Sequence, residues 1–484
     1  MNLPLLSHEL LVLALALGLL LVDLWLPLPA KPKLGYAAAA GVGLILLYSL
    51  FWVNIPPDQP VQYAFGQMYA LDGLALFFKR FFLLAALIVL LMSVEFADRI
   101  ASGIAEFYAL ILFALAGMLF ASSANDFALL FVSLELITVT FYVLTSFQRG
   151  LLTSLEAGVK YLIIGALSTS FTVFGIALVY GISHTLNFGT LAGVAAQFGR
   201  NPIFLFGLVL VLVGLGFKIS AVPFQIWAPD VYQGAPAPVT AFLAVGSKAA
   251  GFALLLRVLF IAVPDITAHW SRLLIILSAC SILYGNLCAI PQRNLKRLFG
   301  YSGIAHAGYL LLGIAALSAA GRAAVLYYLS GYLFTVLGAF TVICLVLRQA
   351  DGEDLSALAG LHRRSPLLAA TLTLAMASLA GIPPLAGFFG KFLLFKAVLE
   401  QAPANPGYYC LAFTALAGVV ISLYYYFGVV RAIYWSNDAP DLSPITLSRP
   451  IRISIYVCIA GMFYLGMFPN ALVNLAAQAV EVLR

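Results

Sequence analysis

Apolar residues occur in long runs along the whole chain, and the runs show no alternation of polar and apolar positions. Each run holds about 20 residues, the length that a helix needs to cross the hydrocarbon core of a bilayer. Transmembrane β-barrels instead have short segments of alternating polarity. The pattern therefore predicts an all-α polytopic membrane protein with about fourteen transmembrane helices. The runs centre near residues 15, 44, 84, 112, 137, 169, 214, 250, 279, 308, 336, 380, 421 and 464.

Two of the predicted spans are interrupted by helix-breaking residues. The seventh reads LVGLGFKISAVPFQIWAPDVY and contains Pro223, and the twelfth reads LAMASLAGIPPLAGFFGKFLLF and contains Pro383 and Pro384. Proline removes a backbone donor, and in hydrocarbon such a break needs protein or water to satisfy the freed carbonyls. Because the two spans are an odd number of spans apart, their helices run in opposite directions. This arrangement is typical of inverted repeats around an ion path, although two unrelated proline kinks would give the same pattern.

Connections between the spans are short, and the longest polar ones lie around 183–202, 348–365 and 436–452. The chain is apolar almost from its start and has no positively charged leader, so residues near 4–26 are expected to form a retained helix. Lys and Arg are unevenly distributed, with twelve in odd-numbered connections and three in even-numbered ones. By the positive-inside rule, the odd connections lie in the cytoplasm and both termini lie outside.

Composition supports the membrane class and excludes several others. Of the 484 residues, 63% are hydrophobic and 9% are charged, whereas a soluble domain has about 25% charged residues. The net charge of +6 comes without a basic cluster that could follow a nucleic acid backbone. No C-x-x-C pair, G-x-G-x-x-G or Walker loop is present, so we expect no metal and no cofactor in this chain.

Four of the ionisable residues inside the apolar spans are the strongest functional candidates. Glu135 and Lys248 are near the middle of theirs, Lys218 is one turn before Pro223, and Lys391 is one to two turns after the break in the twelfth span. An intramembrane charge costs about 2.5–3.5 kcal/mol on insertion scales, which makes each residue a functional candidate. The alternatives are structural ion pairs and lysines that reach the membrane interface.

Lysine suits proton transfer because burial favours its neutral amine, while a nearby carboxylate favours the charged form. We expect Glu135 to set the charge state of Lys218 by opening or closing an ion pair. His306, in YSGIAHAGYLLL, is a candidate relay between Lys248 and Lys391, or a satisfied core histidine.

Other polar residues give weaker signals. Glu156 and Lys160 are four residues apart and are expected to form a pair on one helix face, with a role in the relay as the alternative. The run Tyr424, Tyr425 and Tyr426 is more typical of packing or of an aromatic belt than of water binding. Lys79 and Arg80 lie within the third span, and the sequence assigns them no role.

Several segments resemble the antiporter-like, proton-pumping membrane subunits of bacterial NADH–quinone oxidoreductase, respiratory complex I. These are GLGFKISAVPFQIWAPDVYQGAPAPVTAFLAVGSKAAGF, SLELI, RNLKRLFGYSGIAHAGYLL and LAGIPPLAGFFGKF. The likeness covers essentially the whole chain. DVYQGAPAP favours the subunit N type over subunits L and M, and the chain lacks the long C-terminal extension of subunit L.

The resemblance implies a division of the chain into four parts. Helices 1–3 occupy 1–100, the two inverted five-helix repeats occupy 101–262 (helices 4–8) and 263–436 (helices 9–13), and helix 14 occupies 437–484. By match of motif, the proton relay consists of the fifth-helix glutamate, the seventh-, eighth- and twelfth-helix lysines and the tenth-helix histidine. In this sequence they are Glu135, Lys218, Lys248, Lys391 and His306.

One position departs from the family pattern. Many relatives carry histidine after the Pro-Phe of the seventh helix, whereas this chain has Gln225 in PFQIW. Glutamine donates and accepts hydrogen bonds but takes no proton at physiological pH. An obligatory protonation at this position is therefore in doubt.

The resemblance also implies a function and its setting. We expect a translocase subunit of NADH:quinone oxidoreductase in a bacterial inner membrane, with both termini periplasmic. It would have no redox centre, since quinone and NADH react in other subunits, and its partners would be lipid and subunits M, K and J. A multisubunit cation/proton antiporter is the alternative, because it would share the helices and lysines. A structural scaffold would leave the buried charges unexplained.

Overall fold

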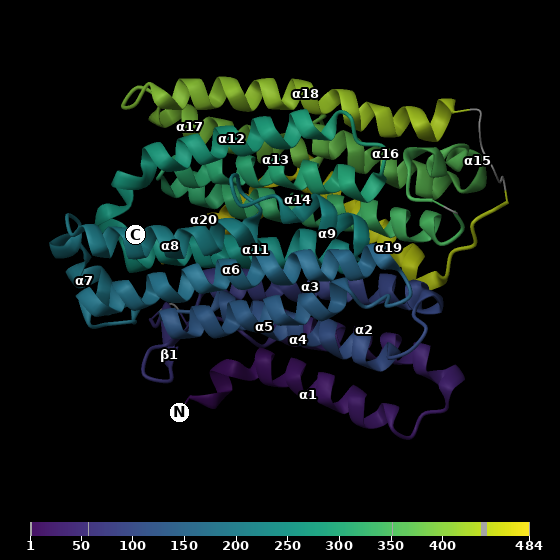
Figure 1. The fold of residues 1–484 in the computed structure, drawn as a ribbon, viewed down its shortest axis with the longest axis horizontal. Helices are drawn as coiled ribbons and strands as arrows, with labels where there is room; N and C mark the ends of the chain where they lie inside the picture. Colours follow the sequence, from purple (N-terminus) through teal and green to yellow (C-terminus); the bar gives the residue numbers. More distant parts are fainter. Residues whose placement is uncertain (1, 57, 351, 437–442, 484) are drawn as a thin grey trace.

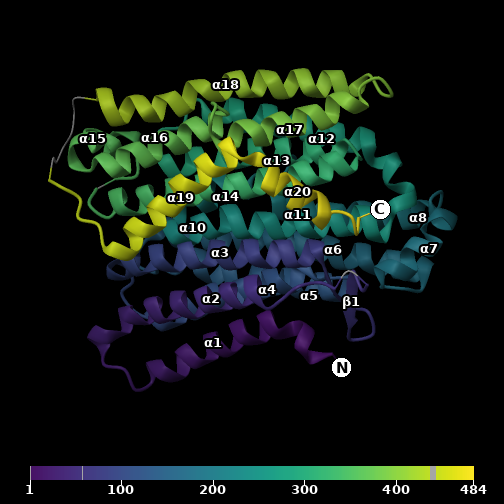
Figure 2. The same cartoon turned by 180° about the vertical axis from the view of Figure 1, so that it is seen from behind.

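The computed structural model describes residues 2–56, 58–350, 352–436 and 443–483. Its long helices lie roughly side by side, from α1 at one edge to α18 at the opposite edge (Figure 1), and α19 and α20 run obliquely over one face (Figure 2). Among the described residues, 13 helices are long and apolar enough to cross a membrane. The broken twelfth span adds one more, so the all-α class and the expected number of spans are confirmed.

The first part of the chain forms three spans and a short hairpin. Strands β1 and β2 pair antiparallel between the second and third spans, a feature that the hydrophobic pattern did not predict. Asp72 at the end of β2 accepts a hydrogen bond from the backbone of Ala75, which caps the third span. The elements are α1 (Ser7–Asp23), α2 (Leu34–Phe51), β1 (Val61–Ala64), β2 (Tyr69–Asp72) and α3 (Gly73–Phe96).

The middle of the chain contains spans four to eight. The predicted polar connection around 183–202 contains the helix α7. The eighth span is one continuous helical stretch with two π-helical segments, η4 and η5. The elements are α4 (Ile104–Ser122), α5 (Phe127–Thr145), α6 (Leu152–Ser183), α7 (Phe188–Phe198), α8 (Pro202–Ile219), α9 (Trp227–Gly234), α10 (Ala237–Phe242), η4 (Leu243–Ser247), α11 (Lys248–Arg257) and η5 (Val258–Ala262).

The remaining spans follow the predicted order. The sequence predicted one helix, the fourteenth span, at the end of the chain. The structure has two helices there, α19 and the shorter α20. The predicted boundary at residue 437 lies outside the described residues, and the division into four parts stays a prediction. The elements are α12 (Ser271–Ala289), α13 (Leu295–Ala315), α14 (Ala319–Leu347), α15 (Leu361–Arg364), α16 (Pro366–Ala380), α17 (Ala386–Gln401), α18 (Gly407–Trp435), α19 (Arg449–Met467) and α20 (Pro469–Ala479).

Both predicted helix breaks are present. The seventh span ends as α8 at Ile219 and resumes as α9 at Trp227, and the twelfth ends as α16 at Ala380 and resumes as α17 at Ala386. Between them lie the two proline segments that the sequence identified. Each break therefore interrupts the backbone hydrogen bonds of its helix inside the bundle. Only protein or water can satisfy the freed backbone groups there.

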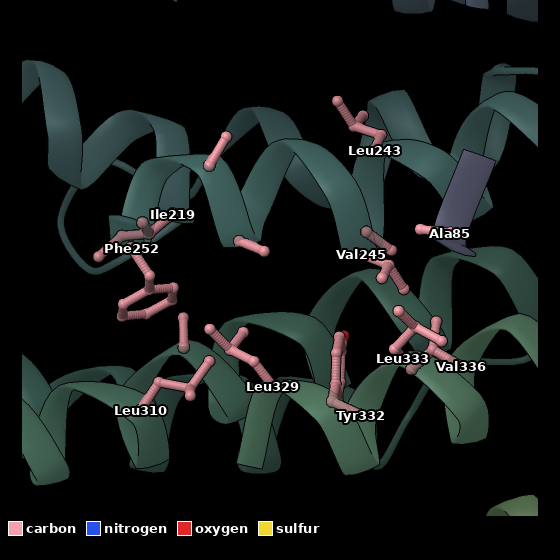
Figure 3. Packing of buried hydrophobic residues seen from close by; sticks show 14 of the residues in the cluster. Ala85, Ile219, Leu243, Val245, Phe252, Leu310, Leu329, Tyr332, Leu333 and Val336 are labelled. Atoms are coloured by element: carbon pink, nitrogen blue, oxygen red, sulfur yellow. The ribbon is translucent and has the colours of Figure 1, made fainter. Parts of the chain in front are cut away.

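Three spans form the centre of the bundle. The eighth, tenth and eleventh spans have their most apolar windows 100%, 94% and 94% buried, whereas the same measure for α6 is 28%. Val245 of the eighth span points toward Leu333 and Val336 of α14, and Phe252 lies near Leu329 (Figure 3). The outer helices expose mainly apolar side chains, as expected for surfaces that face lipid.

Candidate functional site

Lys218 and Glu135 border the same small cavity. It has a volume of about 20 Å³, enough for about one water molecule. The Lys218 amine donates to Thr138 Oγ1 at 3.0 Å, and Glu135 Oε1 accepts from Thr169 Oγ1 at 2.7 Å. Among the ion pairs of the described residues none joins the two. The expected partners thus line one cavity, and each bonds a threonine hydroxyl instead of the other.

The two lysines beside the helix breaks lie on different sides of them, Lys218 before its break and Lys391 after. Lys218 lies in the last turn of α8. The Lys391 amine donates to the carbonyls of Leu379 and Ala380, at 2.7 and 3.1 Å, at the end of α16. The C-terminal end of a helix carries partial negative charge and unpaired carbonyls, so the break in the twelfth span presents acceptors to the Lys391 amine.

Lys248 begins α11 immediately after the π-helical segment η4. Its buried amine donates to the carbonyl of Gly303 in α13 at 2.6 Å. An added Cβ at Gly251, one turn further along α11, would lie 3.2 Å from Lys218 Cγ. The side chain of Lys218 therefore packs against the helix that carries Lys248. Single π turns inside helices are frequent at functional sites.

His306 lies one turn after Gly303 on α13, and both of its ring nitrogens have partners. Nδ1 is 2.5 Å from the hydroxyl of Tyr328, and Nε2 is 2.9 Å from the hydroxyl of Tyr426. Tyr426 also bonds the hydroxyl of Ser302 at 2.5 Å. The reading of Tyr426 as a packing residue alone was wrong, since its hydroxyl lies in this network, whereas Tyr424 is 71% exposed.

Aromatic rings connect His306 to the lysines on either side. The Lys248 amine lies 5.8 Å from the ring centroid of Tyr332, which is 5.1 Å from that of His306. On the other side, the Lys391 amine lies 5.0 Å from the centroid of Tyr309, which is 6.0 Å from His306. The structure thus places His306 between Lys248 and Lys391, with one tyrosine ring on each side.

Gln225, the position that departs from the family pattern, is buried in the break between α8 and α9. Its Oε1 has no hydrogen-bond partner among the described residues. A buried amide oxygen of this kind is normally satisfied by water.

Glu156 and Lys160 form the expected helix-face pair at 2.7 Å. Lys160 also contacts Asp230 of α9 at 2.6 Å, and Asp230 forms a second ion pair with Arg297 of α13. The Lys160 side chain is 41% exposed. This network joins three helices near the surface, apart from the buried lysines.

Lys79, which the sequence left unassigned, is completely buried in α3. It forms an ion pair with Glu9 of α1 and donates to the hydroxyl of Tyr69 at 2.8 Å. Arg80 donates to the carbonyls of Ser49 and Val53 at 2.7 and 2.8 Å. Among the residues that the structure describes, no group of three or more His, Cys, Asp or Glu could hold a metal ion.

Comparison with known proteins gives matches along the full length of the chain. The family model described as NADH:quinone oxidoreductase/Mrp antiporter, TM, matches residues 124–421. NADH-quinone oxidoreductase subunit N of Moorella thermoacetica is 40% identical over 481 residues, covering 99% of this chain and 98% of that protein. Subunit N of Rhodospirillum rubrum is 40% identical over 480 residues, covering 98% and 96%.

Solved structures include similar folds. A chain of respiratory complex I from Thermus thermophilus with bound Aureothin is 36% identical with a TM-score of 0.79, covering 97% of this chain and 99% of that one. A chain of the Mrp complex from Dietzia sp. has a TM-score of 0.83, covering 100% and 98%, and at 21% identity it shows likeness of fold alone.

Proposed function

This chain belongs to the NADH-quinone oxidoreductase subunit N family, and from that membership we propose that it moves protons across a bacterial inner membrane. The path consists of Glu135, Lys218, Lys248, His306 and Lys391. The driving reaction, quinone reduction with electrons from NADH, takes place in other subunits, so the chain acts as one translocase subunit of the complex. Its partners are lipid and other membrane-arm subunits, with M, K and J as neighbours and both termini periplasmic.

One observation supports this proposal: the amine of each of the three relay lysines donates a hydrogen bond to an uncharged acceptor. Lys248 donates to a backbone carbonyl, Lys391 to two carbonyls, and Lys218 to a threonine hydroxyl. A carbonyl accepts a hydrogen bond from either the charged or the neutral amine. Loss of a proton from any of these three lysines therefore breaks no ion pair among the described residues.

Lys79 provides the contrast within the same chain. It is also completely buried, but its amine is paired with the buried carboxylate of Glu9. Removing a proton from Lys79 would leave that carboxylate uncompensated in a low-dielectric interior, which is strongly unfavourable. Lys79 thus has the contacts of a structural ion pair, and Lys218, Lys248 and Lys391 have the contacts of groups that change charge.

Proton movement through this subunit needs an external source of free energy. Moving one charge against a membrane potential costs about 2.3 kcal/mol per 100 mV. The proposal places the redox reaction in other subunits. That distant reaction must therefore change which of the buried residues carry a charge. A change in hydration of the small cavity between Glu135 and Lys218 would alter their interaction, because water weakens Coulomb attraction.

A subunit of a multisubunit cation/proton antiporter is the second candidate, favoured by the similar fold of the Mrp chain. The sequence comparison separates the two candidates: identity is 40% to subunit N of Moorella thermoacetica and 21% to the Mrp chain. Genes for other complex I subunits beside this one, rather than antiporter genes, would support the first.

The direct test replaces Lys218 by methionine and Glu135 by glutamine, each in the assembled complex. Proton pumping and quinone reduction are measured in proteoliposomes, with Lys396→Met as the control, since Lys396 is an exposed lysine paired with Glu400. We expect pumping to fall strongly in the first two variants and to stay normal in the third. Normal pumping in the Lys218→Met and Glu135→Gln variants would contradict the roles proposed for these two residues in proton transfer.

A further inference from the structure

An apolar cavity lies between α2, α3 and α14 on the face that α19 and α20 cross obliquely (Figure 2). Its volume is about 510 Å³, within the range of about 300–1,000 Å³ that is typical of ligand sites. Most of its wall consists of leucine and phenylalanine side chains, and no residue of the proposed relay lines it. Two of the lining residues, Leu50 and Leu475, are 46% and 45% exposed, so the cavity opens at the outer surface of the bundle.

The cavity has the depth of one leaflet of the membrane. Its wall on α3 extends from Gly73, the first residue of that helix, to Leu84, which is about 16 Å along the helix axis. This length is about half of the hydrocarbon core of a bilayer. Phe51 and Trp52, at the end of α2, are 69% and 72% exposed, and such aromatic side chains are typical of the membrane interface. The cavity therefore lies in the leaflet nearer the connection between α2 and α3, which is the periplasmic leaflet in the proposed orientation.

Arg80 is the one charged residue among the described residues that line this cavity. Its Nη2 donates to the carbonyls of Ser49 and Val53 at the end of α2, which holds the guanidinium toward the membrane interface. Its Nε is buried and has no hydrogen-bond partner in the described part of the chain, although buried donors normally have one. None of the ion pairs found there includes Arg80. The guanidinium thus has neither a counterion nor an acceptor for its Nε.

The short helix α20 forms the wall of the cavity that faces α3 and α14. Leu472, Leu475 and Ala479 line the cavity, and their spacing of three and four residues places them on one face of the helix. Asn474, between them in the sequence, is exposed. A helix with one apolar and one polar face lies in the plane of the membrane interface. The position of α20 therefore agrees with a cavity that lies directly beneath the lipid headgroups.

Two features of the cavity select the chemistry of its occupant. Apolar walls that open toward lipid accept an acyl chain, and a guanidinium without a counterion binds the oxygens of a phosphate. We propose that one phospholipid of this leaflet occupies the cavity, with an acyl chain between α3, α14 and α20 and its phosphate bound to Arg80. This site goes beyond the proposed function, since lipid binding here does not depend on proton movement.

A photoreactive lipid tests the site in the assembled complex. The complex is reconstituted with phosphatidylglycerol that carries a diazirine near the end of one acyl chain, washed with detergent, and then irradiated. Washing removes the lipids that only surround the bundle, and mass spectrometry identifies the peptides that the retained probe has modified. The outer face of α6, where Ile163 is 64% exposed, is the internal control for surrounding lipid.

We expect retained probe on the peptides that contain Leu84 of α3 and Phe334 of α14, and none on α6. A diacylglycerol with the same diazirine lacks the phosphate and is expected to wash out. Equal retention of the two probes, or no probe on α3 and α14, would overturn the inference. Displacement of the probe by added ubiquinone but not by unlabelled phosphatidylglycerol would also overturn it, because the cavity would then hold an isoprenoid tail.

Two substitutions separate the charge from the walls of the cavity. Arg80→Met keeps an apolar side chain but removes the charged donors, so we expect retention of the probe to fall by about tenfold. Arg452→Met, at an exposed arginine in the first turn of α19, is the matched control. Leu84→Trp keeps Arg80 and fills the deep end of the cavity, so it should also lose the probe and serves where Arg80→Met fails to assemble. Full retention in either assembled variant would overturn the inference.

Discussion

At the scale of single residues, hydrogen-bond contacts distinguish the proposed relay lysines, which donate to uncharged acceptors, from Lys79, which forms an ion pair with Glu9. Glu135, Lys218, Lys248 and Lys391 could be found from the sequence because a charge inside an apolar run is costly and therefore rare. The role of Tyr426 could not be found from the sequence. A tyrosine in an apolar run gives the same pattern whether its hydroxyl faces lipid or His306. The partner of Lys79 was equally hidden, since Glu9 is 70 positions away.

The hydrogen bond between Tyr426 and His306 leads to the first prediction. Tyr426→Phe removes one partner of His306 and of Ser302 without removing the ring. A hydrogen bond contributes about 1 kcal/mol, so we expect about fivefold slower pumping in a complex that assembles normally. Proteoliposome assays measure the rate, and Tyr424→Phe on the same helix is the control. An unchanged rate in Tyr426→Phe would show that the tyrosine only packs.

Gly303 leads to the second prediction. A Cβ at this position would lie 2.9 Å from the Lys248 amine, so Gly303→Ala forces the flexible end of the lysine away from its carbonyl acceptor. We expect normal assembly and reduced pumping, because the amine moves while the helix backbone does not. Gly428→Ala, where nothing lies within 4 Å, is the control. Equal pumping in the two variants would argue against a precise position for Lys248.

At the scale of elements, the breaks in the seventh and twelfth spans were predictable because proline has a strong and local effect on helices. The π-helical segment before Lys248 was not, since LAVGS has no residue type that demands it. The β1–β2 hairpin was hidden for a different reason: its strands have 4 residues each, too few for a clear periodic pattern.

The attachment of α1 to α3 leads to the third prediction. Glu9→Ala leaves the charge of Lys79 buried and unpaired, which costs about 3–5 kcal/mol of stability. We expect a clear fall in the melting temperature of the purified complex, measured by thermal unfolding. The double variant Glu9→Gln/Lys79→Met should recover most of the stability and pump normally. Lost pumping in a stable double variant would place this pair in the proton path.

At the scale of the whole molecule, two of the five residues of the proposed relay occupy the helices that are best shielded from lipid. Lys248 and His306 belong to the eighth and tenth spans, which are almost fully buried, and outer helices such as α1 and α6 expose apolar side chains. The hydrophobic pattern predicted the spans but not which of them lie at the centre of the bundle, because all spans are similarly apolar. Contacts between distant helices, such as that of Lys248 with Gly303, decide which spans become central.

In the proposed path Lys248 joins the two halves, so its replacement tests the central claim most directly. The measurement is the number of protons pumped per quinone reduced, in proteoliposomes containing the complex with Lys248→Met. Lys396→Met is measured beside it as a control for loss of a lysine. We predict a clear fall in pumping for Lys248→Met, with the assembled amount unchanged. An unchanged proton yield would contradict a path that runs through the buried lysines.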